Sequence, residues 1–274
     1  MEYILLIAIG MLSGVVGSLV GLGGGTIFVP VTLLVGIDLG WIPHVTPQTV
    51  VGMSVIMMVF NGLSSTLYHL KAKTVDYRSG LIFFAGSVPG TIVGAFFNRG
   101  LDLNSFNIYF GLLLIFLAAL LLVKKYLKPI RWFVDHGKPI TFTDPQGQDH
   151  VYGYPIWFAL VFTFFIGLTS GLFGIGGGAM LVPGMILLFL FPPHVAVGTS
   201  MLMVFLSALV NSGTHIYLGH VPWLYSLAVI PGAYIGGTVG SMLNKKLSSE
   251  ALVVVLRILL LLFGVNSIID GIWG

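Results

Sequence analysis

The stretch "SGLFGIGGGAMLVPGM", residues 170–185, interrupts an apolar run with five glycines in nine positions. A second stretch, "GSLVGLGGGTIFVPVT", residues 17–32, carries the same Gly-x-Gly-Gly-Gly core, and in both a proline stands five residues after the last glycine. Consecutive glycines weaken a helix because they lose much conformational entropy on ordering and readily adopt positive φ. The sequence therefore predicts a helical chain that is broken twice, at equivalent places.

The composition indicates that the chain lies in a lipid bilayer. Hydrophobic residues make up 57% and charged residues 8% of its 274 residues, which is too little polar surface for a water-soluble domain. Cysteine is absent, so disulfides and thiolate metal sites are excluded. The net charge of +3 comes from short loops beside apolar spans, and this pattern does not indicate a nucleic-acid partner.

Eight apolar segments have the length needed to cross a bilayer. They are expected at about 3–20, 49–69, 79–97, 106–123, 154–172, 197–217, 223–243 and 250–270. The first begins with an acidic residue instead of the basic region of a secretory signal, so we expect an uncleaved span. Two shorter apolar pieces, at about 26–36 and 179–191, follow the glycine clusters directly and are too short to cross alone.

One long polar region, residues 124–153, separates a first membrane repeat, residues 1–123, from a second, residues 154–274. Within it, Asp-Pro-Gln-Gly stands between "ITFT" and "HVYGY", an order typical of a small β-hairpin. A flexible linker is the alternative. In either case the region belongs to neither repeat, so we expect it not to be part of the transport core.

The two halves repeat the same landmarks in the same order, which indicates a duplicated unit. Each unit holds a broken helical hairpin followed by three spans, so two units in tandem point in opposite directions across the membrane. We therefore predict an all-α polytopic membrane protein with two inverted-topology repeats. The aligned pairs are Gly23 to Gly25 with Gly176 to Gly178, Pro30 with Pro183, Gly52 with Gly198, Ser54 with Ser200, Ser65 with Asn211, His69 with His215, Pro89 with Pro231, Gly90 with Gly232 and Gly94 with Gly236.

Loop charges predict the orientation, because Lys and Arg collect on the cytoplasmic side. The loop "KAKTVDYR" at 71–78 holds three basic residues, whereas its counterpart "YLGHVPWL" at 217–224 has no Lys or Arg. Placing the polar region inside puts eleven of the twelve basic residues at the inner face and leaves Arg99 outside. We therefore expect a multi-pass protein of the cytoplasmic (inner) membrane of a prokaryote, with both termini outside. Arg257, within the last span, either snorkels to the inner face or attracts an anion.

The glycine clusters suit an anion. A bare backbone is not tolerated in hydrocarbon, and the first turn of a helix presents free N–H groups and the positive end of the helix dipole. Two such breaks in an inverted repeat would meet near the midplane, where secondary transporters bind substrate. Tight helix packing is the alternative, and we expect it for Gly90/Gly94 and Gly232/Gly236. The predicted binding residues at the breaks are Gly23, Gly24, Gly25, Thr26, Gly176, Gly177 and Gly178.

A polar stripe follows each break, on one helical face. Its members are Ser54, Asn61, Ser65 and His69 in the first half, and Ser200, Ser207, Asn211 and His215 in the second. Asn61, Ser65, Ser207 and Asn211 are candidates for substrate contact, and interhelical hydrogen bonding is the alternative. His69 and His215 lie at opposite membrane faces, as gating or proton-coupling groups or as interfacial anchors. Asp38, Asp76, Asp102 and Asp270 lie near span ends, so coupling through a buried carboxylate is not expected.

The tandem motifs "GLGGG" and "GIGGG", each followed by a proline, resemble the TauE/SafE family of sulfite and organosulfur-anion permeases over essentially the whole chain. The resemblance implies a secondary transporter that exports sulfite, sulfoacetate or a related small sulfur-containing anion. Sequence motifs of catalysis such as Gly-x-Ser-x-Gly and His-Glu-x-x-His are missing, so we expect no enzyme activity, no cofactor and no metal. An anion channel and a non-transporting scaffold are the alternatives, and the sequence leaves a homodimer open.

Overall fold

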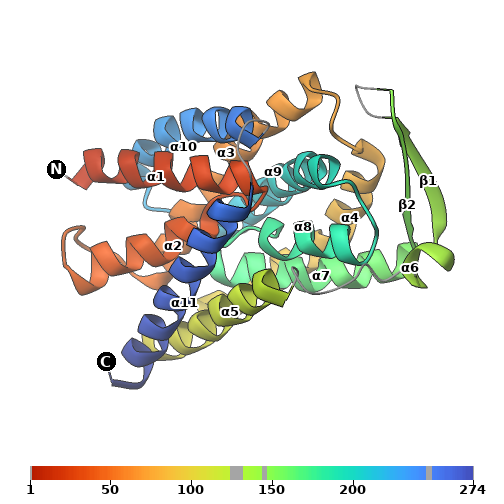
Figure 1. The fold of residues 1–274 in the computed structure, drawn as a ribbon. Coiled ribbons are helices and arrows are strands. Elements are labelled where there is room, and N and C mark those ends of the chain that lie inside the picture. The colour runs from red at the N-terminus through yellow and green to blue at the C-terminus, as the bar shows by residue number, and fades with distance from the viewer. Residues whose placement is uncertain (1, 124–131, 144–146, 245–248, 274) are drawn as a thin grey trace.

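The computed structural model describes residues 2–123, 132–143, 147–244 and 249–273, which form a helical bundle with a small β-hairpin at one end (Figure 1). Within these ranges eight helices are long and apolar enough to cross a membrane. The predicted class, an all-α polytopic membrane protein, is therefore confirmed. The long helices are α1 (Glu2–Val20), α3 (Pro47–Lys71), α4 (Tyr77–Arg99), α5 (Leu103–Val123), α7 (Ile156–Phe173), α9 (Pro193–Tyr217), α10 (Trp223–Asn244) and α11 (Ser249–Trp273).

Both predicted breaks are present. Helix α1 ends at Val20 and a short helix, α2 (Gly25–Leu33), begins after the first glycine cluster. Helix α7 likewise ends before the second cluster, and α8 (Gly178–Leu187) follows it. Gly23 and Gly24 both have φ of 86°, a conformation that glycine adopts at little cost. The sequence did not predict that α2 continues as a π-helix, η1 (Leu34–Asp38).

The polar region contains a short helix, α6 (Trp132–Asp135), and the predicted hairpin of β1 (Lys138–Thr143) and antiparallel β2 (Asp149–Tyr154). Residues 124–131 and most of the Asp-Pro-Gln-Gly turn lie outside the described residues. The hairpin is attached to the bundle, because Tyr152 donates a hydrogen bond to Asp76 (2.8 Å) and Tyr154 donates one to Ser79 (2.7 Å). Burial raises the pKa of Tyr154 to about 12, which keeps its hydroxyl a donor.

The long helices of each half pack mainly against helices of the other half. Helix α1 packs against α10, and its counterpart α7 packs against α4. Helix α3 also contacts α10, and its counterpart α9 also contacts α4. In addition, α3 packs against α9 and α5 against α11. Added Cβ atoms at Gly90 and Gly94 would meet backbone atoms of α7, and ones at Gly232 and Gly236 would meet backbone atoms of α1. The packing function expected of these four glycines is therefore confirmed.

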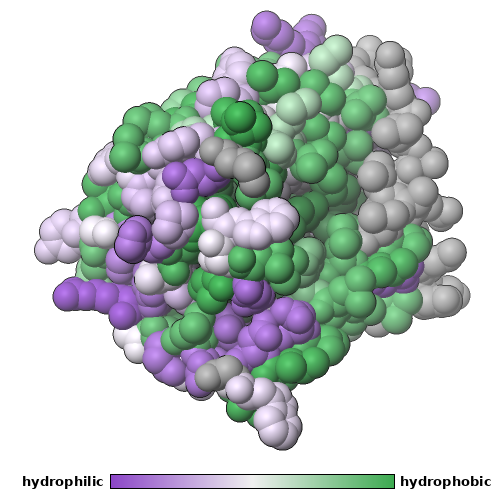
Figure 2. Space-filling view, turned by 90° about the vertical axis from the view of Figure 1, so that its left-hand side faces the viewer, coloured by the Kyte–Doolittle hydropathy of each residue, from purple (hydrophilic) through white to green (hydrophobic). Residues whose placement is uncertain are grey.

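The bundle has two distinct ends. Both chain termini lie at one end and the β-hairpin at the other (Figure 1). The loop before α4 belongs to the hairpin end, because Asp76 contacts Tyr152. The loop before α10 belongs to the end with the termini, where Tyr225 donates a hydrogen bond to Glu2 (3.3 Å). Figure 2 views this end, where hydrophilic side chains gather over one part and hydrophobic side chains over another.

Candidate functional site

The two glycine breaks lie against each other. A Cβ atom added at Gly25 would come within 3.0 Å of the carbonyl oxygen of Gly174, and one added at Gly178 would do the same at the carbonyl oxygen of Gly21. Because Gly25 aligns with Gly178 and Gly21 with Gly174, these are equivalent contacts in the two halves. Glycine at both positions lets the start of each short helix touch the other break.

Serines of the two polar stripes donate hydrogen bonds to these carbonyl groups, each from the opposite half of the chain. Ser54 of α3 donates a hydrogen bond to the carbonyl oxygen of Gly174. Its counterpart, Ser200 of α9, donates one to the carbonyl oxygen of Gly21 at 2.9 Å. Each half therefore holds the broken backbone of the other half with a buried serine, so the contact between the breaks is built by both.

The first turns of α2 and α8 present backbone N–H groups at this contact. In α2, the N–H groups of Ile27 and Phe28 both donate to the carbonyl oxygen of Gly24, at 3.1 and 3.0 Å. For the N–H groups of Gly25 and Thr26, no acceptor is found among the described residues. The Thr26 hydroxyl, completely buried, has no partner in that part of the chain either.

The same arrangement occurs at α8, with one chemical difference. Met180 and Leu181 donate to the carbonyl oxygen of Gly177, at 3.3 and 3.0 Å, while the N–H groups of Gly178 and Ala179 lack an acceptor within the described ranges. Ala179 occupies the position of Thr26, so a hydroxyl is present in the first half alone. Gly23 and Gly176, with φ of 86° and 73°, lie in the segments that lead into these turns.

The two asparagines of the stripes bind backbone too, Asn61 in the first break and Asn211 in the last turn of α7 before the second break. Asn61 donates to the carbonyl oxygen of Gly23 (3.0 Å) and accepts a hydrogen bond from Ser18 (2.7 Å). Asn211 donates to the carbonyl oxygen of Ser170 (3.2 Å). Its side-chain oxygen is buried and lacks a partner among the residues that are described. Asn211 therefore keeps one free acceptor, whereas both polar atoms of Asn61 are engaged.

The other two predicted serines, Ser65 and Ser207, bond to helices α10 and α4. Ser65 shares a hydrogen bond with Ser241 of α10 (2.7 Å), and Ser207 shares one with Ser87 of α4 (2.8 Å). The two bonds join corresponding helix pairs, α3 with α10 and α9 with α4, through serines that are not themselves aligned. In this conformation both serines connect helices and neither bonds to a break.

The two histidines lie near the ends of α3 and α9, and neither bonds to the touching carbonyl groups of Gly21 and Gly174. His69 contacts the hydroxyl of Thr74 through Nδ1 (3.0 Å). His215 contacts the carbonyl oxygen of Gly171 through Nε2 (3.1 Å) and Nδ1 of His220 through its own Nδ1 (3.1 Å). Since a carbonyl accepts, His215 carries its proton on Nε2, and His220 must donate from Nδ1.

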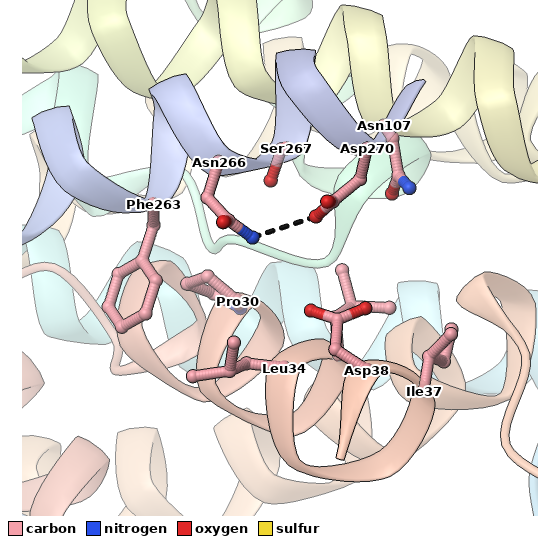
Figure 3. A pocket seen from close by; sticks show the side chains of 10 residues that line it. Pro30, Leu34, Ile37, Asp38, Asn107, Phe263, Asn266, Ser267 and Asp270 are labelled. Carbon is pink, nitrogen blue, oxygen red and sulfur yellow. Dashed lines mark hydrogen bonds between the residues drawn. The ribbon is translucent and has the colours of Figure 1, made fainter. Parts of the chain in front are cut away.

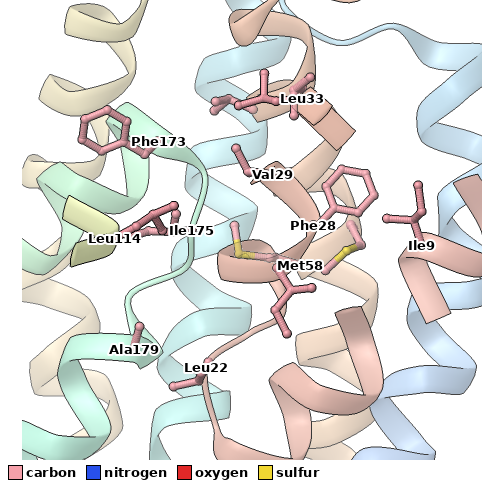
Figure 4. Close-up of a cluster of buried hydrophobic side chains, with 14 of the residues drawn as sticks. Ile9, Leu22, Phe28, Val29, Leu33, Met58, Leu114, Phe173, Ile175 and Ala179 are labelled. Atoms are coloured by element: carbon pink, nitrogen blue, oxygen red, sulfur yellow. The ribbon is translucent and has the colours of Figure 1, made fainter. Parts of the chain in front are cut away.

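The surroundings of the breaks are apolar and closed. Leu22 and Ile175 from the two connecting segments lie in one buried hydrophobic cluster with Met58 and with Ala179 of α8 (Figure 4). Every residue from Gly21 to Pro30 is buried. In the described part of the chain, no three His, Asp or Glu side chains gather as metal ligands do. The polar groups at the breaks are thus mainly backbone groups in a medium that strengthens electrostatic interactions.

Comparison with known proteins gives the family. The profile of the family described as Sulfite exporter TauE/SafE matches residues 6–267. The chain belongs to the TauE/SafE family. No solved structure matches it significantly.

Relatives of this TauE/SafE chain include a "Probable membrane transporter protein YunE" of Bacillus subtilis, 44% identical over all of both chains. A "Probable membrane transporter protein" of Xylella fastidiosa strain Temecula1 is 27% identical over 90% of this chain and 87% of its own. A further one from Methanocaldococcus jannaschii is 25% identical over 95% and 93%. Together with the eight spans, these relatives show a multi-pass membrane transporter.

Several polar residues at the TauE/SafE breaks were not predicted. Ser18 fixes Asn61, and Ser13 lies buried in α1 with its carbonyl oxygen near Gly24. Ser18 stands just before the first glycine cluster, so its proximity to the motif was the available signal, whereas Ser13 lies more than a helical turn earlier in α1. His220 gave no such signal, because its contact with His215 depends on how the loop folds back.

Proposed function

We propose that this transporter exports a small sulfur-containing anion, such as sulfite, sulfoacetate or a related organosulfonate, by alternating access. The anion binds between the first turns of α2 and α8. The observation that carries the proposal is the set of backbone N–H groups at Gly25, Thr26, Gly178 and Ala179, which lack acceptors in the described chain at the point where the two breaks touch.

Physical chemistry supports an anion at this place. Two helix N-termini contribute partial positive charge, and their N–H groups match the oxygen atoms of a sulfite or sulfonate group. The apolar surroundings weaken screening, so these dipoles act more strongly than they would in water. Backbone donors recognise charge and shape, which suits sulfite and organosulfonates alike. The Thr26 hydroxyl adds one side-chain donor.

The closed breaks correspond to an occluded state of the cycle. The repeats are inverted, and rocking of one half against the other exposes the anion to either side in turn. The hairpin end carries Lys71, Lys73 and Arg78, whereas Arg99 lies at the end with the termini, so the excess of basic residues places the hairpin end in the cytoplasm. Export then runs from the hairpin end to the end with the termini.

A matched pair of threonines in α2 tests the binding site. Thr26 and Thr32 are both completely buried, and both hydroxyls lack a partner in the described chain. Thr26 lies in the first turn at the break, whereas Thr32 lies near the other end of the helix. Thr26→Val should weaken binding of the best anion about tenfold, a loss of about 1.4 kcal/mol. Thr32→Val should leave the affinity unchanged.

The measurement is binding to the purified chain, screened over sulfite, sulfoacetate, thiosulfate, sulfate and phosphate, followed by transport in proteoliposomes. Equal affinity of the two threonine variants for the best anion would place the substrate elsewhere. Preference for phosphate or sulfate over the sulfonates would reject the sulfur-anion assignment. Flux that rises linearly with anion concentration, without saturation, would identify a channel instead of a transporter.

A further inference from the structure

A small pocket lies at the end with the termini, where the α2–η1 segment meets α5 and α11. It is bounded by η1 on one side and by α11 and α5 on the other (Figure 3). Its volume of about 20 Å³ holds roughly one water molecule or one bare ion. Its polar lining comes from Asp38, Asn107, Asn266, Ser267 and Asp270.

Two carboxylates face each other across this pocket. Asp38 ends η1, and Asp270 projects from α11 towards it (Figure 3). Asp38 is exposed on one side, and its pKa is raised, first by partial loss of hydration against the pocket and then by the negative charge of Asp270. Asn266 donates a hydrogen bond to Asp270 at 2.7 Å. Among the residues that line the pocket there is no Lys, Arg or His, so the lining itself does not offset the two negative charges.

Ser267 supplies an independent indication of a ligand. Its side chain is 8% exposed, and its oxygen points into the gap between α11 and η1 (Figure 3). A serine within a helix commonly donates to a carbonyl oxygen one turn earlier. Ser267 makes neither this bond nor any other hydrogen bond within the described parts of the chain, and it lines the pocket. A hydroxyl that faces the pocket without a hydrogen-bond partner in the described chain leaves its oxygen lone pairs available to a cation.

We propose that this pocket binds one calcium ion or a closely similar hard cation. Asp38 and Asp270 supply two negative charges, which match a divalent ion, and Asn107, Asn266 and Ser267 supply neutral oxygens. Calcium accepts six to eight such ligands in irregular geometry with water completing the shell, whereas magnesium demands a regular octahedron. The C-terminal end of the α2–η1 segment adds the negative end of its dipole.

The proposed ion connects two parts of the transporter. It joins the far end of the helix that begins at the first glycine break to α11, which packs mainly against α5. The anion then sits at the positive end of the α2–η1 segment and the cation at its negative end. Calcium therefore stabilises the position of the segment whose first turn forms half of the anion site.

Calcium binding to the purified full-length chain, freed of divalent ions with a chelator, tests the proposal directly by isothermal titration. We expect one ion per chain and a rise in Tm on adding calcium, since the ion binds the folded state. Asp38→Asn and Asp270→Asn should each weaken binding at least tenfold, and Ser267→Ala should weaken it several-fold. Asp102→Asn removes an exposed carboxylate at the start of α5 and should bind as the wild type does.

Each outcome decides the question. No heat of binding and no Tm shift in the wild type would overturn the proposal without any variant. Equal binding in all the variants would place the ion elsewhere. Saturation by sodium or potassium in place of calcium would reject the divalent assignment. The Tm of each variant measured without calcium shows that it is folded, so a loss of binding cannot be mistaken for unfolding.

Discussion

The contact between the two breaks can be tested by adding single methyl groups. Gly25→Ala and Gly178→Ala each place a Cβ within 3.0 Å of a carbonyl oxygen of the other break, where an ordinary contact is 3.4–4 Å. Neither glycine has positive φ, so the backbone itself tolerates alanine. The breaks must then move apart by roughly 1 Å, at a cost of about 1–3 kcal/mol for each substitution, which is typical of an overpacked core.

The two costs should be similar, because the two contacts are equivalent. They should also fail to add, since the separation that accommodates the first methyl group makes room for the second. We expect the double variant to be more stable than the sum of the single effects by about 1 kcal/mol. Gly213→Ala in α9 is the control: its Cβ would meet no atom within 4 Å, and helix propensity favours it by up to about 1 kcal/mol.

The measurement is the free energy of unfolding in bicelles, obtained by steric trapping for the four variants and the wild type. A single variant within about 0.5 kcal/mol of the wild type would show that the breaks do not touch as described. Strict additivity in the double variant would show that the two contacts are independent. Either result would remove the geometric basis for a shared site.

Three further predictions concern the ends of the bundle. A membrane-impermeant thiol reagent on intact cells should label Asp102→Cys and spare Lys71→Cys, and the reverse pattern would reject the proposed orientation. Tyr152→Phe removes a hydrogen bond to a carboxylate and should lower stability by about 1.5–3 kcal/mol in thermal unfolding, whereas Tyr217→Phe, 82% exposed, should not. The pKa of His220 is lowered, first by burial and then by the charge of Arg99, so the unfolded chain binds its proton more readily. Stability should therefore be full above pH 6.5 and fall below it, and a Tm profile equally steep in His220→Gln would assign the effect to another group.

The elements of the fold were largely predictable, because each depends on local sequence. Apolar runs of sufficient length gave the eight spans, and the glycine clusters marked where α1 and α7 end. Asp-Pro-Gln-Gly between two β-prone runs gave the hairpin. The π-helical continuation of α2 was missed because the sequence 34–38 carries no local signal for it.

The partners of the polar residues could not be predicted to the same degree. The stripe spacing placed Ser54 and Ser200 on one helical face but did not reveal that each bonds to the break of the other half. That pairing depends on how α3 and α9 cross, which is decided by packing between segments far apart in the chain. The anchoring of Tyr152 on Asp76 is equally non-local.

The exchanged packing of α1 with α10 constrains how the chain is made. During synthesis α1 enters the bilayer long before its main partner exists, and α3 waits as long for the same helix. Most of α3 is buried in the finished protein, so its polar face must meanwhile lie against lipid or be shielded by the insertion machinery. A ribosome stalled after the first half thus leaves a fragment without its core, a substrate for membrane proteases. Supplying the second half as a separate polypeptide should rescue that fragment, because α7, α9, α10 and α11 of that half provide the packing partners that the fragment lacks.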